Sequence, residues 1–147
     1  MRNYAILMYK SVKKKEEERQ GNQMEIHESA EDYLETILIL KERSGQVRSI
    51  DIANEMNLSK PSVSRAVRIL KDGGFISVDK NGYITLTADG KNTAESVYER
   101  HTVLTEWLVG IGVDEKTAAE DACRLEHSFS DESFDKLKKH IQTFHKN

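Results

Sequence analysis

Cysteine and proline are scarce in this chain, which has one of each among its 147 residues. A single cysteine excludes an intramolecular disulfide. The lack of proline, together with only eight glycines, favours a mainly helical, non-fibrous protein. No apolar run approaches the roughly 18 residues that a membrane-spanning helix needs. We therefore expect a reduced, cytoplasmic protein of about one domain's length, with no membrane partner.

Enzyme signatures are missing as well. The sequence contains no His-Glu-x-x-His pair, no glycine-rich phosphate loop and no nucleophile elbow. Its length also excludes most large enzyme folds. We therefore expect a protein that is not an enzyme and that has no small-molecule substrate.

Charge is distributed unevenly along the chain. The net charge is −3, but residues 1–24 hold six basic and three acidic residues, which leaves 16 basic and 22 acidic residues for 25–147. Within this acidic body, residues 59–71 contain four basic residues and no acidic one. A basic segment in an acidic chain suggests a localised contact with a polyanion, whereas the acid-rich segment 114–135 suggests bound cations. The alternative for each is a solvated helix face, which is the commoner meaning of a charge run.

The first 24 residues differ from the rest. A block of three lysines and three glutamates occupies positions 13–18, and helical periodicity begins only after Met24. We interpret residues 1–24 as an extension that is disordered or marginally helical, with Met24 as an alternative start of translation.

Three helices are predicted in the first half of the chain. Ser29 caps the first, which ends near residues 44–45, and Ser49 caps a short second helix. Ser59 caps the third, with Pro61 in the first turn, where its missing N–H is harmless. The very short connection between the second and third helices is typical of a helix-turn-helix.

The third helix has the features of a DNA-recognition helix. Its apolar stripe repeats at i, i+3, i+4 and i+7, which leaves short polar and basic side chains on the opposite face to approach base edges and phosphates. Two β-rich segments follow, separated by an Asn81-Gly82 step that is the strongest short hairpin signal, so the motif is a winged helix. The alternative is a winged helix that serves structure or protein interaction. The residues expected to contact DNA are Ser59, Lys60, Pro61, Ser62, Ser64, Arg65, Arg68 and, on the wing, Lys80.

Three more helices are predicted after the hairpin, and Thr87, Asp114 and Ser130 mark their starts. Their apolar stripes carry more apolar surface than a winged domain needs for its own core. Helix-turn-helix proteins usually read two half-sites about one DNA turn apart, so we expect these helices to form a homodimer.

Side chains with metal-ligand chemistry lie on these helices. Cys123, Glu126 and His127 stand at i, i+3 and i+4, so they project from one helical face. Thiolate, carboxylate and imidazole together form a ligand set for transition metals. His101 lies on the apolar stripe of the preceding helix, where an unpartnered imidazole would be poorly solvated.

Two acidic residues of the first helix, Asp32 and Glu35 at i and i+3, could complete the metal shell. The alternatives are ordinary. A lone cysteine is usually a small core residue, a histidine on an apolar stripe is more often hydrogen-bonded in a core, and Asp32 could cap its helix. If His101 and Cys123 were only core residues, the protein would be a winged-helix regulator that senses an organic ligand.

Between residues 29 and about 135 the chain resembles the diphtheria toxin repressor family of metal-dependent repressors, which includes iron-dependent and manganese-dependent regulators. The motifs that carry the resemblance are SAEDYLE at 29–35, SKPSVS at 59–64, RH at 100–101 and DACRLEH at 121–127. The resemblance implies a repressor of metal-uptake genes that binds double-stranded operator DNA as a homodimer, with the metal as corepressor.

The resemblance also implies a ligand set. Residues matching metal ligands of the manganese branch are Asp32, Glu35, His101, Glu126 and His127, and those matching the iron branch are Cys123, Glu126 and His127. The iron branch has methionine in place of Asp32, and the manganese branch has glutamate in place of Cys123. Mn²⁺ or Fe²⁺ is therefore the expected corepressor, with Co²⁺ and Zn²⁺ as other ions that such ligands accept.

The expected fold class is mainly α. A winged helix-turn-helix DNA-binding domain at residues 25–92 precedes an all-helical dimerisation and metal-binding domain at 93–147. Because the chain ends soon after the last predicted helix, we expect the third, SH3-like domain of the longer iron regulators to be absent.

Overall fold

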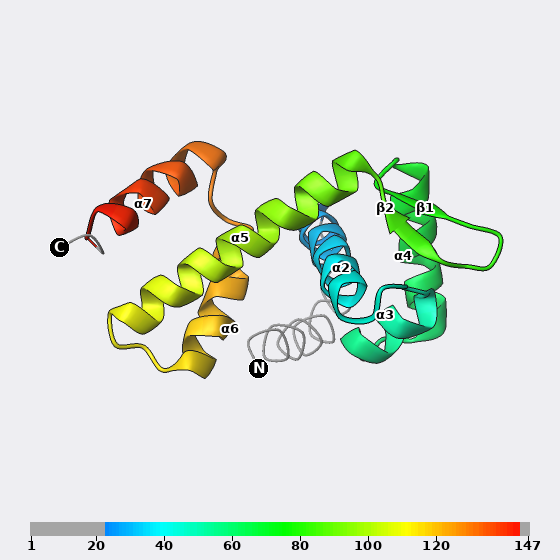
Figure 1. Cartoon of the computed structure of the whole chain (residues 1–147), viewed down its shortest axis with the longest axis horizontal. Helices are drawn as coiled ribbons and strands as arrows, with labels where there is room; N and C mark the ends of the chain where they lie inside the picture. Colours follow the sequence, from blue (N-terminus) through cyan, green and yellow to red (C-terminus); the bar gives the residue numbers. More distant parts are fainter. Residues whose placement is uncertain (1–22, 145–147) are drawn as a thin grey trace.

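A computed structural model describes residues 23–144, which form six α-helices and one two-stranded sheet. In Figure 1, α3, α4 and the hairpin lie at one end, α6 and α7 lie at the other, and the long helix α5 runs between the two ends. This arrangement is the mainly α fold class predicted from the sequence. Most of the predicted extension, residues 1–22, lies outside the described residues. The elements in chain order are α2 (Gln23–Ser44), α3 (Ser49–Met56), α4 (Lys60–Asp72), β1 (Ile76–Val78), β2 (Ile84–Leu86), α5 (Ala88–Gly110), α6 (Glu115–Leu125) and α7 (Asp131–Phe144).

Helix α2 begins six residues before Ser29, so the prediction that Ser29 caps this helix is wrong. Several of the residues at 23–28 are good helix formers, and a serine inside a helix costs only a few tenths of a kcal/mol, roughly, so the helix runs through the expected cap. The predicted end is correct, since Gly45 takes a φ of 78° and closes the last turn. Residues 32–40 are all buried because α3, α4, α5 and β2 all pack against α2.

The turn between α3 and α4 is tight. Asn57 ends α3 in the left-handed conformation with a φ of 52°, which asparagine tolerates better than most residues. The Ser59 hydroxyl accepts the N–H of Ser62 at 3.3 Å and starts α4, with Pro61 in the first turn. These features confirm the predicted helix-turn-helix connection.

The start of α3 differs by one residue from the prediction. Arg48, rather than Ser49, is the cap, and the Asp51 carboxylate accepts the Arg48 backbone N–H at 2.8 Å. Because Asp51 in the first turn bonds the backbone of Arg48, the helix begins at Ser49 and Arg48 is its N-cap. The prediction of a Ser49 cap is therefore wrong.

The wing is an antiparallel hairpin, as predicted. Its turn is held by the Asp79 carboxylate, which accepts the N–H groups of Asn81 at 2.8 Å and Tyr83 at 2.9 Å. Gly82 takes a φ of 82°, a conformation that favours glycine. Lys80 is exposed at the tip of the wing.

Helix α5 starts against the root of the wing. The Thr87 hydroxyl caps it by accepting the N–H of Gly90 at 3.2 Å. A Cβ atom at Gly90 would lie 1.9 Å from the Phe75 carbonyl oxygen, so only glycine permits this close approach. The helix then continues without a break through the predicted domain boundary at 92–93, and the domain limits remain a prediction.

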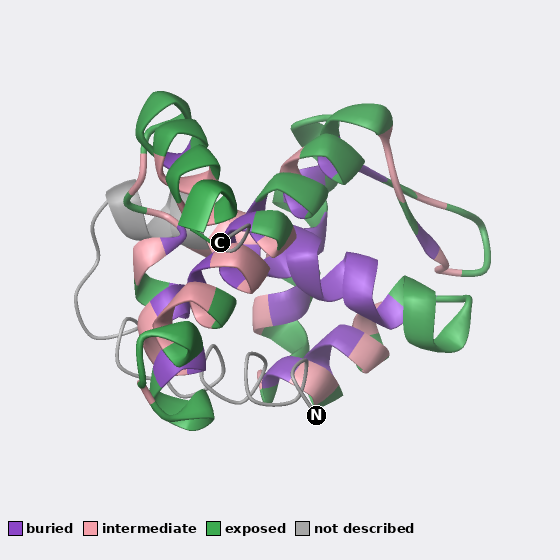
Figure 2. Cartoon of the chain, turned by 60° about the vertical axis from the view of Figure 1, so that its left-hand side comes forward, coloured by how far each residue is buried: buried purple, intermediate pink, exposed green. Residues whose placement is uncertain are grey.

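Buried apolar side chains form two clusters. The larger cluster joins α2, α3, α4 and the hairpin, and the smaller one, around Leu104, Ala122 and Phe134, joins α5, α6 and α7. Figure 2 shows the buried residues gathered at the centre of the molecule and the exposed ones on its outer faces. Asp114 and Ser130 cap α6 and α7 as predicted.

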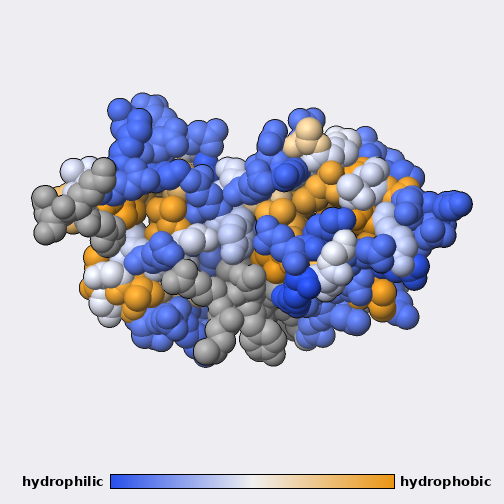
Figure 3. All heavy atoms as spheres, in the orientation of Figure 1, coloured by the Kyte–Doolittle hydropathy of each residue, from blue (hydrophilic) through white to orange (hydrophobic). Residues whose placement is uncertain are grey.

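The face shown in Figure 3 is largely hydrophilic, with apolar side chains reaching the surface toward the winged end and at the end where α5 stops. Val109 and Ile111 are 38% and 63% exposed there, and Phe144 on α7 is 68% exposed. All three lie in the part of the chain that is expected to dimerise. Within residues 23–144, no helix has the length and apolar character needed to cross a membrane.

Candidate metal centre

All six residues predicted as metal ligands lie on three elements that pack together: α2, α5 and the C-terminal end of α6 with the turn after it. Five of them are between 1% and 8% exposed, and the side chain of the sixth, His127, is 2% exposed. Burial of this many ionisable groups is costly unless they pair with one another or bind a cation. The six residues are Asp32, Glu35, His101, Cys123, Glu126 and His127.

A first group of three ligand atoms contains one nitrogen, one sulfur and one oxygen. His101 Nδ1 lies 2.9 Å from Glu126 Oε2 and 3.5 Å from Cys123 Sγ. The three residues offer ligand atoms that all lie within 4.8 Å of one another. The other ring nitrogen of His101, Nε2, lies 3.2 Å from the hydroxyl of Thr105, one turn along α5. Nδ1 is therefore the nitrogen of His101 that faces the group.

A second group contains two carboxylates and one imidazole. His127 Nε2 lies 3.1 Å from Asp32 Oδ1 and 3.3 Å from Glu126 Oε1. These ligand atoms also lie within 4.8 Å of one another. The two oxygens of Glu126 thus face different groups: Oε2 faces His101 on α5, and Oε1 faces His127 in the turn after α6, which contacts Asp32 on α2.

The structure therefore divides the predicted set. Cys123 and His127, which the spacing places on one helical face, belong to different groups that share Glu126. The division arises because α6 ends at Leu125, so His127 stands in the turn beyond it. Glu35 is buried on α2 one turn after Asp32, and it belongs to neither group.

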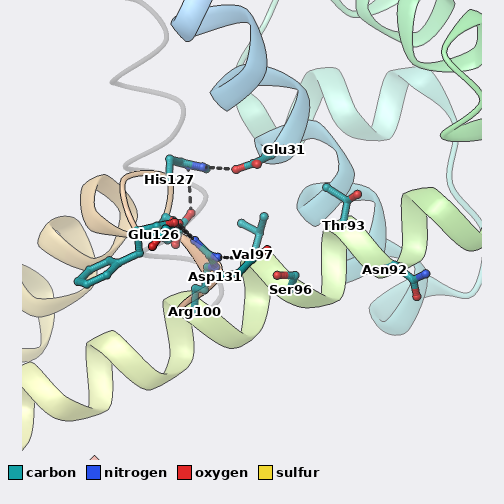
Figure 4. Close-up of a pocket in the computed structure, with 11 residues that line it drawn as sticks. Glu31, Asn92, Thr93, Ser96, Val97, Arg100, Glu126, His127 and Asp131 are labelled. Atoms are coloured by element: carbon teal, nitrogen blue, oxygen red, sulfur yellow. Dashed lines mark hydrogen bonds and ion pairs between the residues drawn. The ribbon is translucent and has the colours of Figure 1, made fainter. Parts of the chain in front are cut away.

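His127 also contacts a carboxylate that the sequence did not single out. Its Nδ1 lies 2.6 Å from Glu31 Oε2, across the gap between α2 and the turn after α6 (Figure 4). Burial lowers the pKa of His127, but hydrogen bonds with Asp32, Glu126 and Glu31 outweigh it and raise the pKa to about 11. At neutral pH His127 is therefore an imidazolium that offsets part of the surrounding negative charge.

Arg100 anchors the backbone of the turn after α6, next to the second group. The sequence did not identify it as a site residue. Its Nη1 donates to the backbone carbonyls of Glu126 at 3.2 Å and Phe129 at 2.6 Å, and its Nη2 donates to the Asp131 carboxylate at 2.5 Å. The available signal was its position beside His101 on a helix with an apolar stripe, since a buried guanidinium must be paired.

A cavity of about 480 Å³ opens beside the second group (Figure 4). Its walls include Glu31, Arg100, Glu126 and His127, together with polar residues of α5 such as Ser96. Two members of the second group, Glu126 and His127, therefore line the cavity. The donors in both groups are the carboxylate, imidazole and thiolate groups that divalent transition metals prefer.

The predicted DNA-contacting residues lie at the N-cap of α4, on α4 and on the wing, at the opposite end from α7 (Figure 1). All are exposed except Ser62, which is half-buried. The Ser62 hydroxyl accepts hydrogen bonds from Ser59 at 2.8 Å and Arg65 at 3.4 Å, so these side chains form a connected polar surface at the start of the helix. The first turn of α4 has no acidic residue.

Two family models match the chain. The one described as "Iron dependent repressor, N-terminal DNA binding domain" matches residues 25–84, and "Iron dependent repressor, metal binding and dimerisation domain" matches residues 87–147. An uncharacterized HTH-type transcriptional regulator of Methanocaldococcus jannaschii is 35% identical over 119 residues, which are 80% of this chain and 95% of that protein. The transcriptional regulator MntR of Escherichia coli is 32% identical over 117 residues, 80% of this chain and 76% of MntR.

Solved structures show the same similarity. The manganese regulator SloR is 32% identical with a TM-score of 0.68, and the metal-dependent transcriptional regulator MtsR is 27% identical with a TM-score of 0.71. Each match covers 77% of this chain, and the chain spans about half the length of these proteins, 53% in both cases. These matches confirm the family resemblance and the class of function that the sequence predicted.

Proposed function

The chain belongs to the iron dependent repressor family of metal-dependent, DNA-binding repressors, and we propose that Mn²⁺ or Fe²⁺ is the corepressor that lets it bind operator DNA. It acts, in this proposal, as a cytoplasmic homodimer that regulates genes of metal-ion homeostasis and has no enzymatic activity. The observation that carries the proposal is the Glu126 carboxylate, whose two oxygens face His101 on α5 and His127 in the turn after α6, while His127 in turn contacts Asp32 on α2.

The donor residues fit a divalent transition metal. His101, Cys123 and Glu126 would hold one ion, and Asp32, Glu126 and His127 a second, with Glu35 available nearby on α2. When bound, the metal supplies the positive charge that this concentration of buried carboxylates needs. In the metal-free protein the His127 imidazolium takes over part of that task, since it lies within hydrogen-bond distance of Asp32.

The position of α2 explains how metal binding would change the affinity for DNA. This helix is the centre of the winged domain, because residues 32–40 are buried against α3, α4 and β2 as well as α5. Asp32 on α2 and the ligands on α5 and α6 therefore fix the winged domain relative to the helices expected to dimerise. In a homodimer this fixes the distance between two recognition helices, so metal affinity becomes free energy for DNA binding.

The DNA contact is assigned to the start of α4 and to the wing. Serine hydroxyls and the positive end of the helix dipole suit phosphate and base contacts at this end, and the body of the chain is otherwise acidic. The contact residues in this proposal are Ser59, Lys60, Pro61, Ser62, Ser64, Arg65, Arg68 and Lys80.

The donors favour Mn²⁺ for the second group and softer ions for the first. Carboxylates from Asp32 and Glu126 suit Mn²⁺, whereas the Cys123 thiolate suits Fe²⁺, Co²⁺ or Zn²⁺. A manganese regulator and a manganese-dependent repressor are among the similar structures. We therefore expect both Mn²⁺ and Fe²⁺ to activate, with a modest preference for Mn²⁺.

A mobility-shift assay tests the proposal. DNA is first selected from a random pool with the chain and Mn²⁺, and its affinity is then measured with Mn²⁺, with Fe²⁺ without oxygen, and with a chelator. We expect tight binding only with metal, and loss of this response in Glu126→Gln but not in Glu115→Gln, which alters an exposed acid at the start of α6, the helix that Glu126 caps. Equal affinity in chelator and metal would contradict the proposal. Absence of metal binding in equilibrium dialysis would favour a regulator of organic ligands.

A further inference from the structure

Glu31 lies on the opposite side of the His127 ring from the second ligand group. Its Oε2 is 2.6 Å from Nδ1, whereas Asp32 Oδ1 and Glu126 Oε1 are 3.1 and 3.3 Å from Nε2. Figure 4 shows this contact bridging α2 and the turn that follows α6. The side chain of Glu31 is 19% exposed, so the hydrogen bond lies mostly away from solvent.

An imidazole can present only one nitrogen lone pair at a time while the other nitrogen carries a proton. An ionised carboxylate accepts hydrogen bonds and cannot donate them. In the metal-free imidazolium both nitrogens carry protons, and a metal bound among Asp32 and Glu126 would take the place of the proton on Nε2, whereas Glu31 accepts the proton on Nδ1 and would keep it there. A carboxylate on the far nitrogen also makes the ligating nitrogen more basic.

We propose that Glu31 is a positioning residue of the metal centre: it holds His127 with Nδ1 protonated, so that Nε2 is the ligating nitrogen, and it does not itself bind the metal. The inference rests on the proposed function, because it concerns the same site.

The same contact has a consequence for the coupling between domains. Glu31 and Asp32 are neighbours on α2, and they hold the two opposite nitrogens of one imidazole from the turn after α6. Both nitrogens of His127 are thus held by the helix at the centre of the winged domain, with Glu126 also near Nε2. His101 differs, because the hydroxyl that faces its second nitrogen belongs to Thr105 on its own helix. Loss of Glu31 should therefore affect the second ligand group and leave the orientation of His101 unchanged.

Variants of Glu31 test this role by metal affinity. Mn²⁺ binding to the whole chain is measured by electron paramagnetic resonance for Glu31→Ala, Glu31→Gln and Glu31→Asp. We expect Glu31→Ala to weaken Mn²⁺ binding by about 10–100-fold, the usual effect of removing such an outer carboxylate. Glu31→Gln, which keeps a neutral acceptor, should lose less, and Glu31→Asp should restore part of the affinity. Glu42→Gln, at an exposed glutamate of the same helix, serves as the matched control and should bind like the parent.

A spectroscopic measurement on the parent chain tests which nitrogen of His127 binds the metal. With ¹¹³Cd²⁺ bound and histidine labelled with ¹⁵N, nuclear magnetic resonance should show coupling between cadmium and Nε2 of His127, and a proton on Nδ1. In Glu31→Ala the protonated Nδ1 signal should lose its protection from exchange with solvent.

Two results would overturn the inference. One is cadmium coupling to Nδ1 of His127 in the parent chain. The other is Mn²⁺ affinity of Glu31→Ala and Glu31→Gln within twofold of the parent, with the parent binding metal; in that case the proposed function stands and only the role of Glu31 is lost. If the parent chain binds no metal, the proposed function fails together with this inference.

Discussion

Replacement of Arg100 by methionine tests how the metal centre is supported. Arg100 is 8% exposed, and its guanidinium donates to the backbone carbonyls of Glu126 and Phe129 and to the carboxylate of Asp131. The guanidinium carbon also lies 5.2 Å from the centre of the Phe134 ring. Methionine keeps an apolar contact in this space but removes all three hydrogen bonds.

The magnitudes decide which of these bonds matter. The Asp131 side chain is 96% exposed, and an exposed ion pair contributes about 0–1 kcal/mol. A hydrogen bond from a charged donor contributes roughly 1.5–3 kcal/mol. Arg100 donates two such bonds to backbone carbonyls, those of Glu126 and Phe129. Their combined contribution to stability is reduced because burial of the guanidinium is itself costly. We therefore expect Arg100→Met to lower the free energy of unfolding by about 2–4 kcal/mol, and Asp131→Asn by less than about 1 kcal/mol.

Urea unfolding in the presence of a chelator measures both values, at one protein concentration because a homodimer's stability depends on it. Mn²⁺ affinity should also fall in Arg100→Met, since the backbone of Glu126 loses its anchor. If Asp131→Asn cost as much as Arg100→Met, the ion pair and not the carbonyl contacts would hold the turn after α6, and this reasoning would be refuted.

Three further predictions concern the metal, pH and DNA. Cys123→Glu should raise activation of DNA binding by Mn²⁺ relative to Fe²⁺ and Co²⁺, because a hard carboxylate replaces a thiolate; unchanged relative activation in mobility shifts would show that the thiol is only a core residue. The metal-free protein should lose stability as pH rises from 7 to 11. The raised pKa of His127 contributes stability that is fully present below about pH 6.5 and is lost as pH rises through about 11. His127→Gln should therefore weaken the dependence of the free energy of unfolding on pH, as measured by urea unfolding. A parent protein whose stability does not fall over this pH range would contradict the raised pKa of His127. Arg65→Ala should lower the discrimination between specific and random DNA by about 1–3 kcal/mol if Arg65 contacts a base. Lys80→Ala should instead weaken binding to all sequences and reduce the dependence of log affinity on log salt concentration by about one. If Arg65→Ala weakens binding to specific and random DNA equally, Arg65 contacts a phosphate.

Features that depend on a few neighbouring residues were predictable from the sequence. The Ser59 cap and the Asn81-Gly82 turn are present as expected because local hydrogen bonds and local backbone preference determine them. The Ser29 cap failed for a related reason: the helix-forming residues before it extend α2, and no local signal forbids this.

The residue types of the metal centre were also predictable, but their grouping was not. Spacing places Cys123, Glu126 and His127 on one helical face, yet His127 turns to Asp32, 95 positions away, and Cys123 faces His101. Glu31 contacts the other nitrogen of His127 across 96 positions of the sequence. The pairing of carboxylates with imidazoles depends on how α2 packs against α5 and on where α6 ends. The hydrophobic period of a helix carries no information about either, because it describes one element and not the packing between elements.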